Sequence, residues 1–257
     1  MAPSAAYIWP YAVSCAVILG AVVATIQYLI KLRIEELFFH LTPKDYIDFH
    51  AHHPSLQGER VIQDGINTQG RHPWRLLSNP PQGEGDNLHT LNPSSSHSLL
   101  AIGESGLDKV CSTPYNLQLQ VFREEVQRSE QLQKPLFLHC VRAIDDVLRI
   151  RNEVRITQPW IWHGYRGTAQ QLQQLFQQKI YFSFGTYLLP SADGTFSSPK
   201  NIEALLACPA ERLLLETDED IQHSIVLLYK LVAQLRGVSV NSLIRLTHQN
   251  FRTLFED

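Results

Sequence analysis

Cysteine is scarce in this sequence, and the cysteines that are present lie far apart. The 257 residues include Cys15, Cys111, Cys140 and Cys208, and no two of these form a Cys-x-x-Cys pair. This spacing argues against a disulfide framework and fits a reducing compartment better.

An excess of charge of either sign is also missing. The formal net charge is -3 at pH 7, with 18% charged and 44% hydrophobic residues. This argues against a protein that holds nucleic acid by its total charge, although a local basic patch would not show in the total. The composition is that of a globular chain long enough for one large domain of barrel or doubly wound type.

No charged residue occurs in residues 5–30, where positions 11–26 read YAVSCAVILGAVVATI. An apolar run of about 20 residues is long enough to cross a bilayer as a helix. Nothing basic precedes the run, which argues against a cleaved signal peptide. The alternatives to a membrane anchor are a buried N-terminal helix and a start site assigned too far upstream. A later start would need a non-Met codon, because Met1 is the only methionine.

The charges that follow the apolar run indicate how it would be oriented. Lys31, Arg33 and Lys44 all come after it, and the positive-inside rule then places the rest of the chain in the cytoplasm. We therefore expect an apolar helix and linker in residues 1–44, the helix being a candidate membrane anchor. Residues 45–257 are expected to form a monomeric cytoplasmic domain.

Beyond residue 45, apolar strand-like runs alternate with helix-like segments. Strands are predicted in 45–50, 99–104, 135–140, 159–165, 180–185 and 212–218, and helices in 114–133, from about 143, from 168, in 221–236 and in 240–255. Apolar strands that alternate with helices indicate a parallel sheet with covered faces, here an α/β fold of the (β/α) barrel type. Thr113 is expected to cap the helix that follows it. Residues 78–98, rich in Pro and Ser, are expected to form a long loop.

Side chains that can bind metal stand at the ends of five predicted strands. In chain order they are His50 and His52, Glu104, His139, His163 and Asp218. Because the active site of such a barrel lies at the carboxyl ends of its strands, these side chains are expected to converge. Imidazoles and carboxylates are the ligands of zinc, manganese, iron and similar ions, so the pattern predicts a metal site.

The three histidines of YIDFHAHHP, residues 46–54, are not equivalent. Side chains two positions apart in a strand point to the same face. Asp48, His50 and His52 therefore share one face, and His53 lies on the other. This selects His50 and His52 as the ligand pair.

The motifs IDFHAHHP, GRHPW, AIGESGLDK, KPLFLHC, WHGYRG, LLLETD and NFRTLF follow one another as they do in the TatD family. From residue 46 to residue 255 the chain resembles this family of metal-dependent hydrolases of the amidohydrolase superfamily, many of which are deoxyribonucleases. The resemblance implies a distorted TIM-type barrel with two divalent ions, such as Mg, Mn or Zn. It implies one ion held by His50, His52, Glu104 and Asp218, and a second held by Glu104, His139 and His163.

The resemblance and the chemistry of a two-metal centre also suggest roles. Asp218 is the expected general base, since a carboxylate in contact with a metal-bound water can take its proton. Glu104 is the expected bridging carboxylate of the same catalytic centre. His72, in GRHPW, is a candidate substrate contact, and a structural turn residue is its alternative. Arg142 and Arg166 are candidates for phosphate or carboxylate recognition, with solvated loop arginines as the alternative.

The chain departs from the family pattern around the expected substrate groove. Residues 54–70 are too few for the usual second βα unit, which predicts a shortened barrel. ETDED replaces ETDSP, so that Glu219 and Asp220 adjoin Asp218 and disfavour a long polyanion there. The favoured function is a deoxyribonuclease that cleaves phosphodiester bonds in DNA with a metal-activated water. One alternative is a metal-dependent hydrolase of a small ester, lactone or amide, and another is a membrane-attached scaffold that has lost catalysis.

Overall fold

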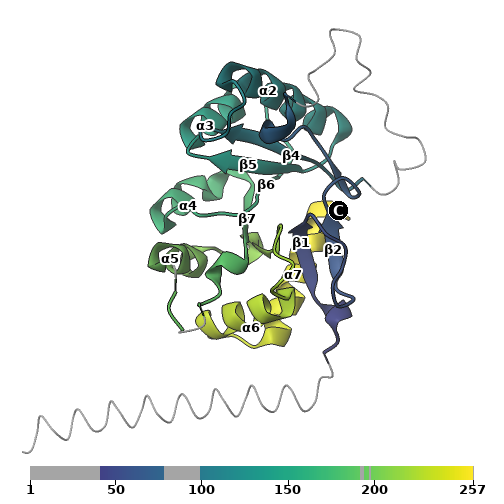
Figure 1. Ribbon diagram of the computed structural model, residues 1–257, viewed down its shortest axis with the longest axis vertical. Coiled ribbons are helices and arrows are strands. Elements are labelled where there is room, and N and C mark those ends of the chain that lie inside the picture. Colours follow the sequence, from purple (N-terminus) through teal and green to yellow (C-terminus); the bar gives the residue numbers. More distant parts are fainter. Residues whose placement is uncertain (1–40, 78–98, 192–193, 197, 257) are drawn as a thin grey trace, which may run out of the picture. The chain divides into compact units, whose positions relative to one another are not determined.

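The computed structural model describes residues 41–77, 99–191, 194–196 and 198–256 (Figure 1). The chain divides into two compact units, Met1–Thr42 and Pro43–Asp257, and every strand and helix that the structure describes belongs to the second unit. The apolar run predicted to form a helix and the loop predicted in 78–98 lie outside the described residues. Among the helices that are described, none is long and apolar enough to cross a membrane.

All the described strands pair in parallel. They are β1 (Ile47–Ala51), β2 (Arg60–Gln63), β3 (Thr68–Gln69), β4 (Ala101–Asp108), β5 (Leu136–Val141), β6 (Trp160–Trp162), β7 (Ile180–Phe184) and β8 (Leu213–Leu215). β1 pairs with β2, and the remaining strands form a six-stranded sheet in the order β3-β4-β5-β6-β7-β8. The predicted α/β fold with parallel strands is confirmed, and the carboxyl ends of the strands lie at one edge of each sheet.

Two isolated bridges join the two sheets. Ala51 at the end of β1 bridges to Asp218, which follows β8, and a second bridge connects the residue after β2 to β3. At the first of these seams the amide of Asp218 donates to the carbonyl oxygen of His50 at 2.9 Å, and the amide of His52 donates to the carbonyl oxygen of Asp218 at 3.0 Å. The strands therefore form a distorted ring, whose closure between β1 and β8 rests on few hydrogen bonds.

Helices cover the outside of this ring and follow the strands in turn (Figure 1). They are α2 (Tyr115–Leu132), α3 (Ile144–Glu153), α4 (Ala169–Leu175), α5 (Pro199–Ala207), α6 (Ile225–Leu235) and α7 (Val240–Phe255), with the 3-10 turns η2 (Pro43–Asp45), η3 (Pro73–Arg75), η4 (Phe176–Gln178), η5 (Thr186–Leu188) and η6 (Ala210–Arg212). Residues 54–70 contain β2 and β3 but no helix, in agreement with a shortened second βα unit.

The helix caps show where local sequence signals succeed and fail. Thr168 begins α4 with a capping box shared with Gln171, as a Thr before a helical segment predicts. The predicted cap of α2 by Thr113 is wrong. The Thr113 hydroxyl donates instead to the carbonyl oxygen of Pro73 at 2.6 Å, and α2 starts at Tyr115 without a side-chain cap. The helix predicted from residue 221 begins at Ile225, because the Ser224 hydroxyl accepts from the Val226 amide and caps it there.

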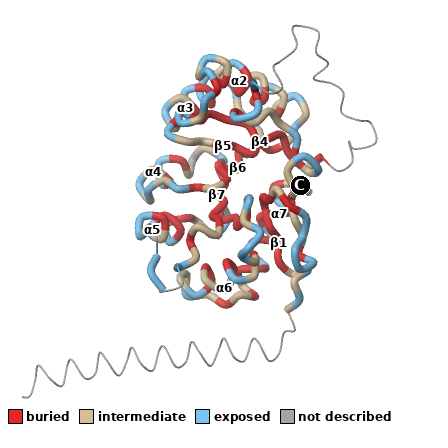
Figure 2. The backbone as a smooth tube through the Cα atoms, viewed as in Figure 1, coloured by how far each residue is buried: buried red, intermediate tan, exposed pale blue. Residues whose placement is uncertain are grey.

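Buried residues concentrate on the strands (Figure 2). Phe137, Ile161 and Leu214 are fully buried in one hydrophobic cluster. Each precedes a polar residue of the same strand or its end by two positions, and so shares its face. These apolar side chains therefore pack next to the polar residues at the carboxyl end of the ring. On the outside of β1, Phe49 packs against Phe251 of α7, with ring centroids 6.2 Å apart.

Candidate metal centre

The structure brings all the predicted metal ligands together at the carboxyl ends of the strands. Their ligand atoms fall into overlapping groups whose members lie within 4.8 Å of one another. Two groups are His50 with His163 and Asp218, and His50 with His52 and Glu104; in the third, Glu104 and His139 are joined by His72, which was predicted as a substrate contact. His50, Glu104 and His139 lie within β1, β4 and β5. His52 and His163 directly follow β1 and β6, Asp218 lies three residues after the end of β8, and His72 precedes η3.

Glu104 occupies the middle of the centre, and its two carboxylate oxygens face different histidines. Oε2 lies 3.3 Å from Nε2 of His50 and 3.4 Å from Nε2 of His52. Oε1 lies 2.5 Å from Nε2 of His163 and 2.9 Å from Nδ1 of His139. The carboxylate thus divides the ring nitrogens into two sets, one on each oxygen.

Asp218 belongs to the first of these sets. Its Oδ1 lies 3.4 Å from Nε2 of His52 and 3.8 Å from Nε2 of His50. The Asp218 side chain is 39% exposed, whereas that of Glu104 is 3% exposed. Asp218 therefore combines contact with the ligand set and access to solvent, which a group that exchanges protons with water needs.

The arrangement of nitrogen and oxygen atoms fits a bound cation. His50 is fully buried, yet neither of its ring nitrogens makes a hydrogen bond within the described residues. Nδ1 of His139 and Nε2 of His163 face one another at 3.2 Å, next to the same oxygen of Glu104. Buried polar atoms are normally satisfied, and lone pairs that converge in this way are satisfied by a metal ion. His50, His52 and Asp218 with one oxygen of Glu104, and His139 and His163 with the other, would hold two ions.

A second layer of carboxylates orients the histidines. Asp64 Oδ2 lies 3.5 Å from Nδ1 of His52. Asp108 Oδ2 lies 3.3 Å from Nε2 of His139, and Glu216 Oε1 lies 3.6 Å from Nδ1 of His163. In each pair the carboxylate faces the ring nitrogen opposite the one that points to Glu104. This is how proteins fix the tautomer and orientation of metal-binding histidines.

Sequence reasoning missed this second layer, although part of the signal was present. Asp108 lies four positions after Glu104 in β4, and Glu216 lies two positions before Asp218 in the strand predicted in 212–218, so in the predicted strands each shares a face with a predicted ligand. Asp64 has no such signal, because it follows a different strand from its partner His52.

We expect Asp108→Asn to weaken metal binding at the His139 set by about 10–100-fold. The substitution removes the charge that faces Nε2 of His139 while keeping the size of the side chain. Calorimetric titration of Mn²⁺ or Zn²⁺ into metal-free protein would measure the loss. Asp146→Asn is the matched control, because Asp146 of α3 is paired with Arg149 of the same helix and with Lys109, which follows β4. Equal affinities in the two variants would contradict an orienting role for Asp108.

The charges within the centre also favour a cation. Burial disfavours the charged form of Glu104, but the neighbouring rings of His163, His139 and His50 outweigh it and hold its pKa well below the ordinary value. Hydrogen bonds to Asp218 and Glu104 raise the pKa of His52 to about 10. Without metal, a proton on His52 therefore balances part of the carboxylate charge, and metal binding would displace it.

His72 lies beside the second set of nitrogens. Its Nε2 is 3.3 Å from Oε1 of Glu104 and 3.2 Å from Nδ1 of His139. Its Nδ1 accepts a hydrogen bond from the backbone amide of Trp74 at 3.2 Å, and burial lowers the pKa of His72. A neutral ring that accepts at Nδ1 carries its proton on Nε2. His72 is thus arranged as a hydrogen-bond donor at the centre, and its alternative as a turn residue is also realised because it caps η3.

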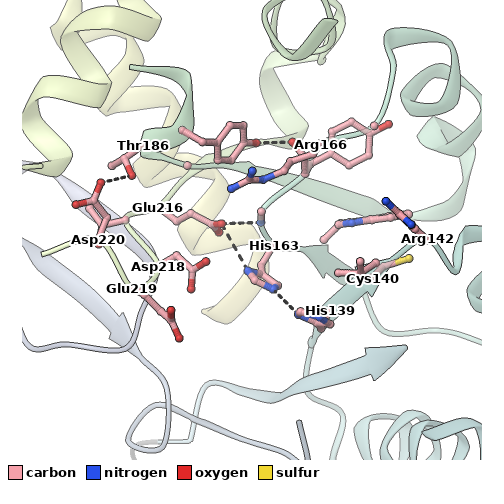
Figure 3. Close-up of a pocket in the computed structure, with 18 of the residues that line it drawn as sticks. His139, Cys140, Arg142, His163, Arg166, Thr186, Glu216, Asp218, Glu219 and Asp220 are labelled. Carbon is pink, nitrogen blue, oxygen red and sulfur yellow. Dashed lines mark hydrogen bonds and ion pairs between the residues drawn. The ribbon is translucent and has the colours of Figure 1, made fainter. Parts of the chain in front are cut away.

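Arg142 and Arg166 line one cavity with some of the candidate metal ligands (Figure 3). The cavity has a volume of about 880 Å³, and His139, His163 and Asp218 also form part of its wall. The Arg166 guanidinium lies over the ring of Tyr187, 4.2 Å from its centroid, which fixes its position. Both predicted cations are therefore on the same cavity as the centre.

A ring of parallel strands with His and carboxylate side chains at its carboxyl ends defines a metal-dependent hydrolase of the barrel type. The model of the TatD-related DNase family matches residues 50–256. The chain belongs to this family, as its motifs predicted.

Relatives with similar sequences carry the same kind of description. An uncharacterized metal-dependent hydrolase of Buchnera aphidicola is 28% identical over 215 residues, which cover 78% of this chain and 76% of that protein. The 3'-5' ssDNA/RNA exonuclease TatD of Salmonella typhimurium is 28% identical over 234 residues, covering 81% and 85% of the two chains.

Solved structures confirm the fold. A TatD family hydrolase from Entamoeba histolytica superposes with a TM-score of 0.63 at 18% identity, over 78% of this chain and 76% of that one. The TatD homologue YJJV of Escherichia coli superposes with a TM-score of 0.61 at 18% identity, over 84% of this chain and 100% of that one.

Proposed function

We propose that this hydrolase cleaves phosphodiester bonds in DNA with two divalent ions. The observation that carries the proposal is the division of the histidines between the two oxygens of Glu104, each within 3.4 Å of its own pair of ring nitrogens. The nuclease names of relatives, such as the exonuclease TatD of Salmonella typhimurium, support the substrate class.

Each residue of the centre would then have a task. Asp218, part exposed beside His52, is placed to accept the proton of the attacking water at Oδ1. His72 donates a hydrogen bond from Nε2, and Arg142 and Arg166 bind the phosphate oxygens from the cavity wall. The two ions, when bound, supply Lewis acidity that polarises the phosphodiester and lowers the pKa of water.

Removal of the metal tests this function directly. Protein dialysed against a chelator is expected to release no nucleotides from single- or double-stranded DNA, and addition of Mg²⁺, Mn²⁺ or Zn²⁺ is expected to restore release. Metal analysis of the purified protein should find about two equivalents per chain, as a two-metal site requires. DNA left intact with every metal, or cleaved at full rate by protein shown to be metal-free, would exclude the proposal. Protein that binds no metal at all would favour the non-catalytic scaffold.

The acidic border of the cavity favours a second candidate, a hydrolase of small esters, lactones or amides. Glu219 and Asp220 line the same cavity, and Asp220 accepts from the Thr186 hydroxyl at 2.6 Å, which fixes a negative charge there. Like charges near the centre oppose the approach of a long polyanion. A panel of phosphodiesters, carboxylic esters and lactones separates the two candidates, because turnover of phosphodiesters alone removes this one.

A further inference from the structure

One large apolar side chain beside the metal centre has no part in the roles above. The Trp74 side chain is 55% exposed. Its ring centroid nevertheless lies 5.1 Å from the ring of His72 and 5.7 Å from the ring of His139. An exposed indole is thus next to the nitrogens that face Glu104.

Hydrogen bonds hold the Trp74 ring in one orientation. Its Nε1 donates to Asp108 Oδ2 at 2.7 Å, and its backbone amide donates to His72. The preceding residue, Pro73, accepts from the Thr113 hydroxyl. The ring contacts His72 and His139 edge to face, at interplanar angles of 85° and 76°. A ligand that packs on this ring would not have to order it first.

The surroundings of the ring suit a nucleotide. Val110, which is 63% exposed, donates its amide to the other oxygen of the same Asp108 carboxylate, so it adds apolar surface nearby. Arg75, the next residue after Trp74, has a 63% exposed side chain, and its Nη1 lies 3.8 Å from Oδ2 of Asp64. This exposed guanidinium adds a positive charge that can contact a phosphate. Aromatic rings with neighbouring cations are the usual means of binding single-stranded nucleic acid without sequence preference.

We propose that Trp74 is a stacking platform for the base of a nucleotide adjacent to the scissile phosphodiester. The inference rests on the proposed function. One sugar joins a base to its phosphate, and the Trp74 ring contacts the rings of His72 and His139 at the centre. A base stacked on Trp74 would therefore hold a neighbouring phosphodiester near the centre. It assigns single-stranded DNA, or an unpaired end, as the bound form, since a base in a duplex is already stacked and paired. Stacking on one aromatic ring contributes about 1–3 kcal/mol per base.

Two substitutions separate stacking from support of the metal centre. Trp74→Ala removes both the ring and the hydrogen bond to Asp108, whereas Trp74→Phe removes the hydrogen bond and keeps an aromatic face. The metal-loaded proteins would be compared on a single-stranded oligonucleotide and on the same oligonucleotide with an abasic residue next to the cleaved bond. Leu206→Ala, at another exposed apolar residue on α5, serves as the surface control.

Trp74→Ala is expected to raise the KM for the intact oligonucleotide about tenfold, as the loss of one stacked base predicts. Trp74→Phe should keep most of the wild-type KM, and Leu206→Ala should keep all of it. On the abasic oligonucleotide, the wild type and Trp74→Ala should have the same KM. An unchanged KM in Trp74→Ala, or equal losses on both oligonucleotides, would overturn the inference.

Binding is measured apart from turnover, as the anisotropy of a labelled phosphorothioate oligonucleotide that resists cleavage. A wild type that binds it through Trp74 but cuts no DNA would reject the nuclease function and keep the stacking site. A wild type that cuts DNA and binds equally well without Trp74 would reject the stacking site alone. A wild type that neither binds nor cuts would reject both.

Discussion

Replacement of Glu104 by glutamine is expected to lower kcat/KM at least about 1000-fold, the upper end of what the loss of one oxyanion-stabilising donor costs in other hydrolases. Glu104 is the single carboxylate that both histidine sets share, so the substitution removes the common anion of both candidate ion sites. The amide has nearly the same size, so packing within the ring is kept. Bound metal should fall together with activity.

Metal content by mass spectrometry and kcat/KM on DNA would measure the effect. Glu203→Gln, an exposed glutamate on α5, is the control for the loss of one negative charge. A Glu104→Gln protein that kept both metal equivalents and a near-normal rate would show that Glu104 does not bridge the two sets.

Replacement of Gly106 by alanine is expected to destabilise the fold by at least about 3 kcal/mol, beyond the usual range for overpacking. Gly106 of β4 pairs with His139 of β5. A Cβ at Gly106 would lie 1.8 Å from the carbonyl oxygen of His139. Because the obstructing atom belongs to the backbone, the two strands would have to separate, and His139 would move away from Glu104.

The midpoint of urea unfolding would measure this change, and metal affinity would report the displacement of His139. Ser105→Ala is the matched control at the neighbouring position of β4. The Ser105 hydroxyl is buried and has no hydrogen-bond partner among the residues described, so its removal should leave the midpoint the same or raise it. Equal midpoints for Gly106→Ala and the wild type would show that β4 and β5 tolerate a wider spacing.

Much of the candidate site follows from strand geometry. Alternation along β1 sends His50 and His52 toward Glu104. The same alternation directs His53 away from Glu104, and Nε2 of His53 lies 3.0 Å from the hydroxyl of Thr217. Because active-site residues of a barrel lie at the carboxyl ends of its parallel strands, the sequence also predicts that the other candidate ligands converge there. Which oxygen of Glu104 lies next to which histidine depends on side-chain rotamers, so the sequence could not predict it.

Contacts between distant segments account for the predictions that failed or were never made. Thr113 precedes a Pro at the expected start of a helix, as a helix cap does. Its hydroxyl instead donates a hydrogen bond to the carbonyl oxygen of Pro73, 40 residues away in the chain. Trp74 follows the His-Pro pair of GRHPW, and the sequence predicts no role for it. Its exposure and its bond to Asp108, 34 residues later, depend on how η3 packs beside β4, which no local pattern encodes.

The seam between β1 and the segment after β8 has a thermodynamic consequence. The backbone bonds that close the ring there belong to His50, His52 and Asp218, whose side chains form one candidate ion site. A cation bound to these three residues ties together the first and last strands of the domain, so part of its binding free energy becomes free energy of folding. Metal-free protein should then lose hydrogen-exchange protection first at the amides of His52 and Asp218. The unfolding temperature should rise with the concentration of free metal.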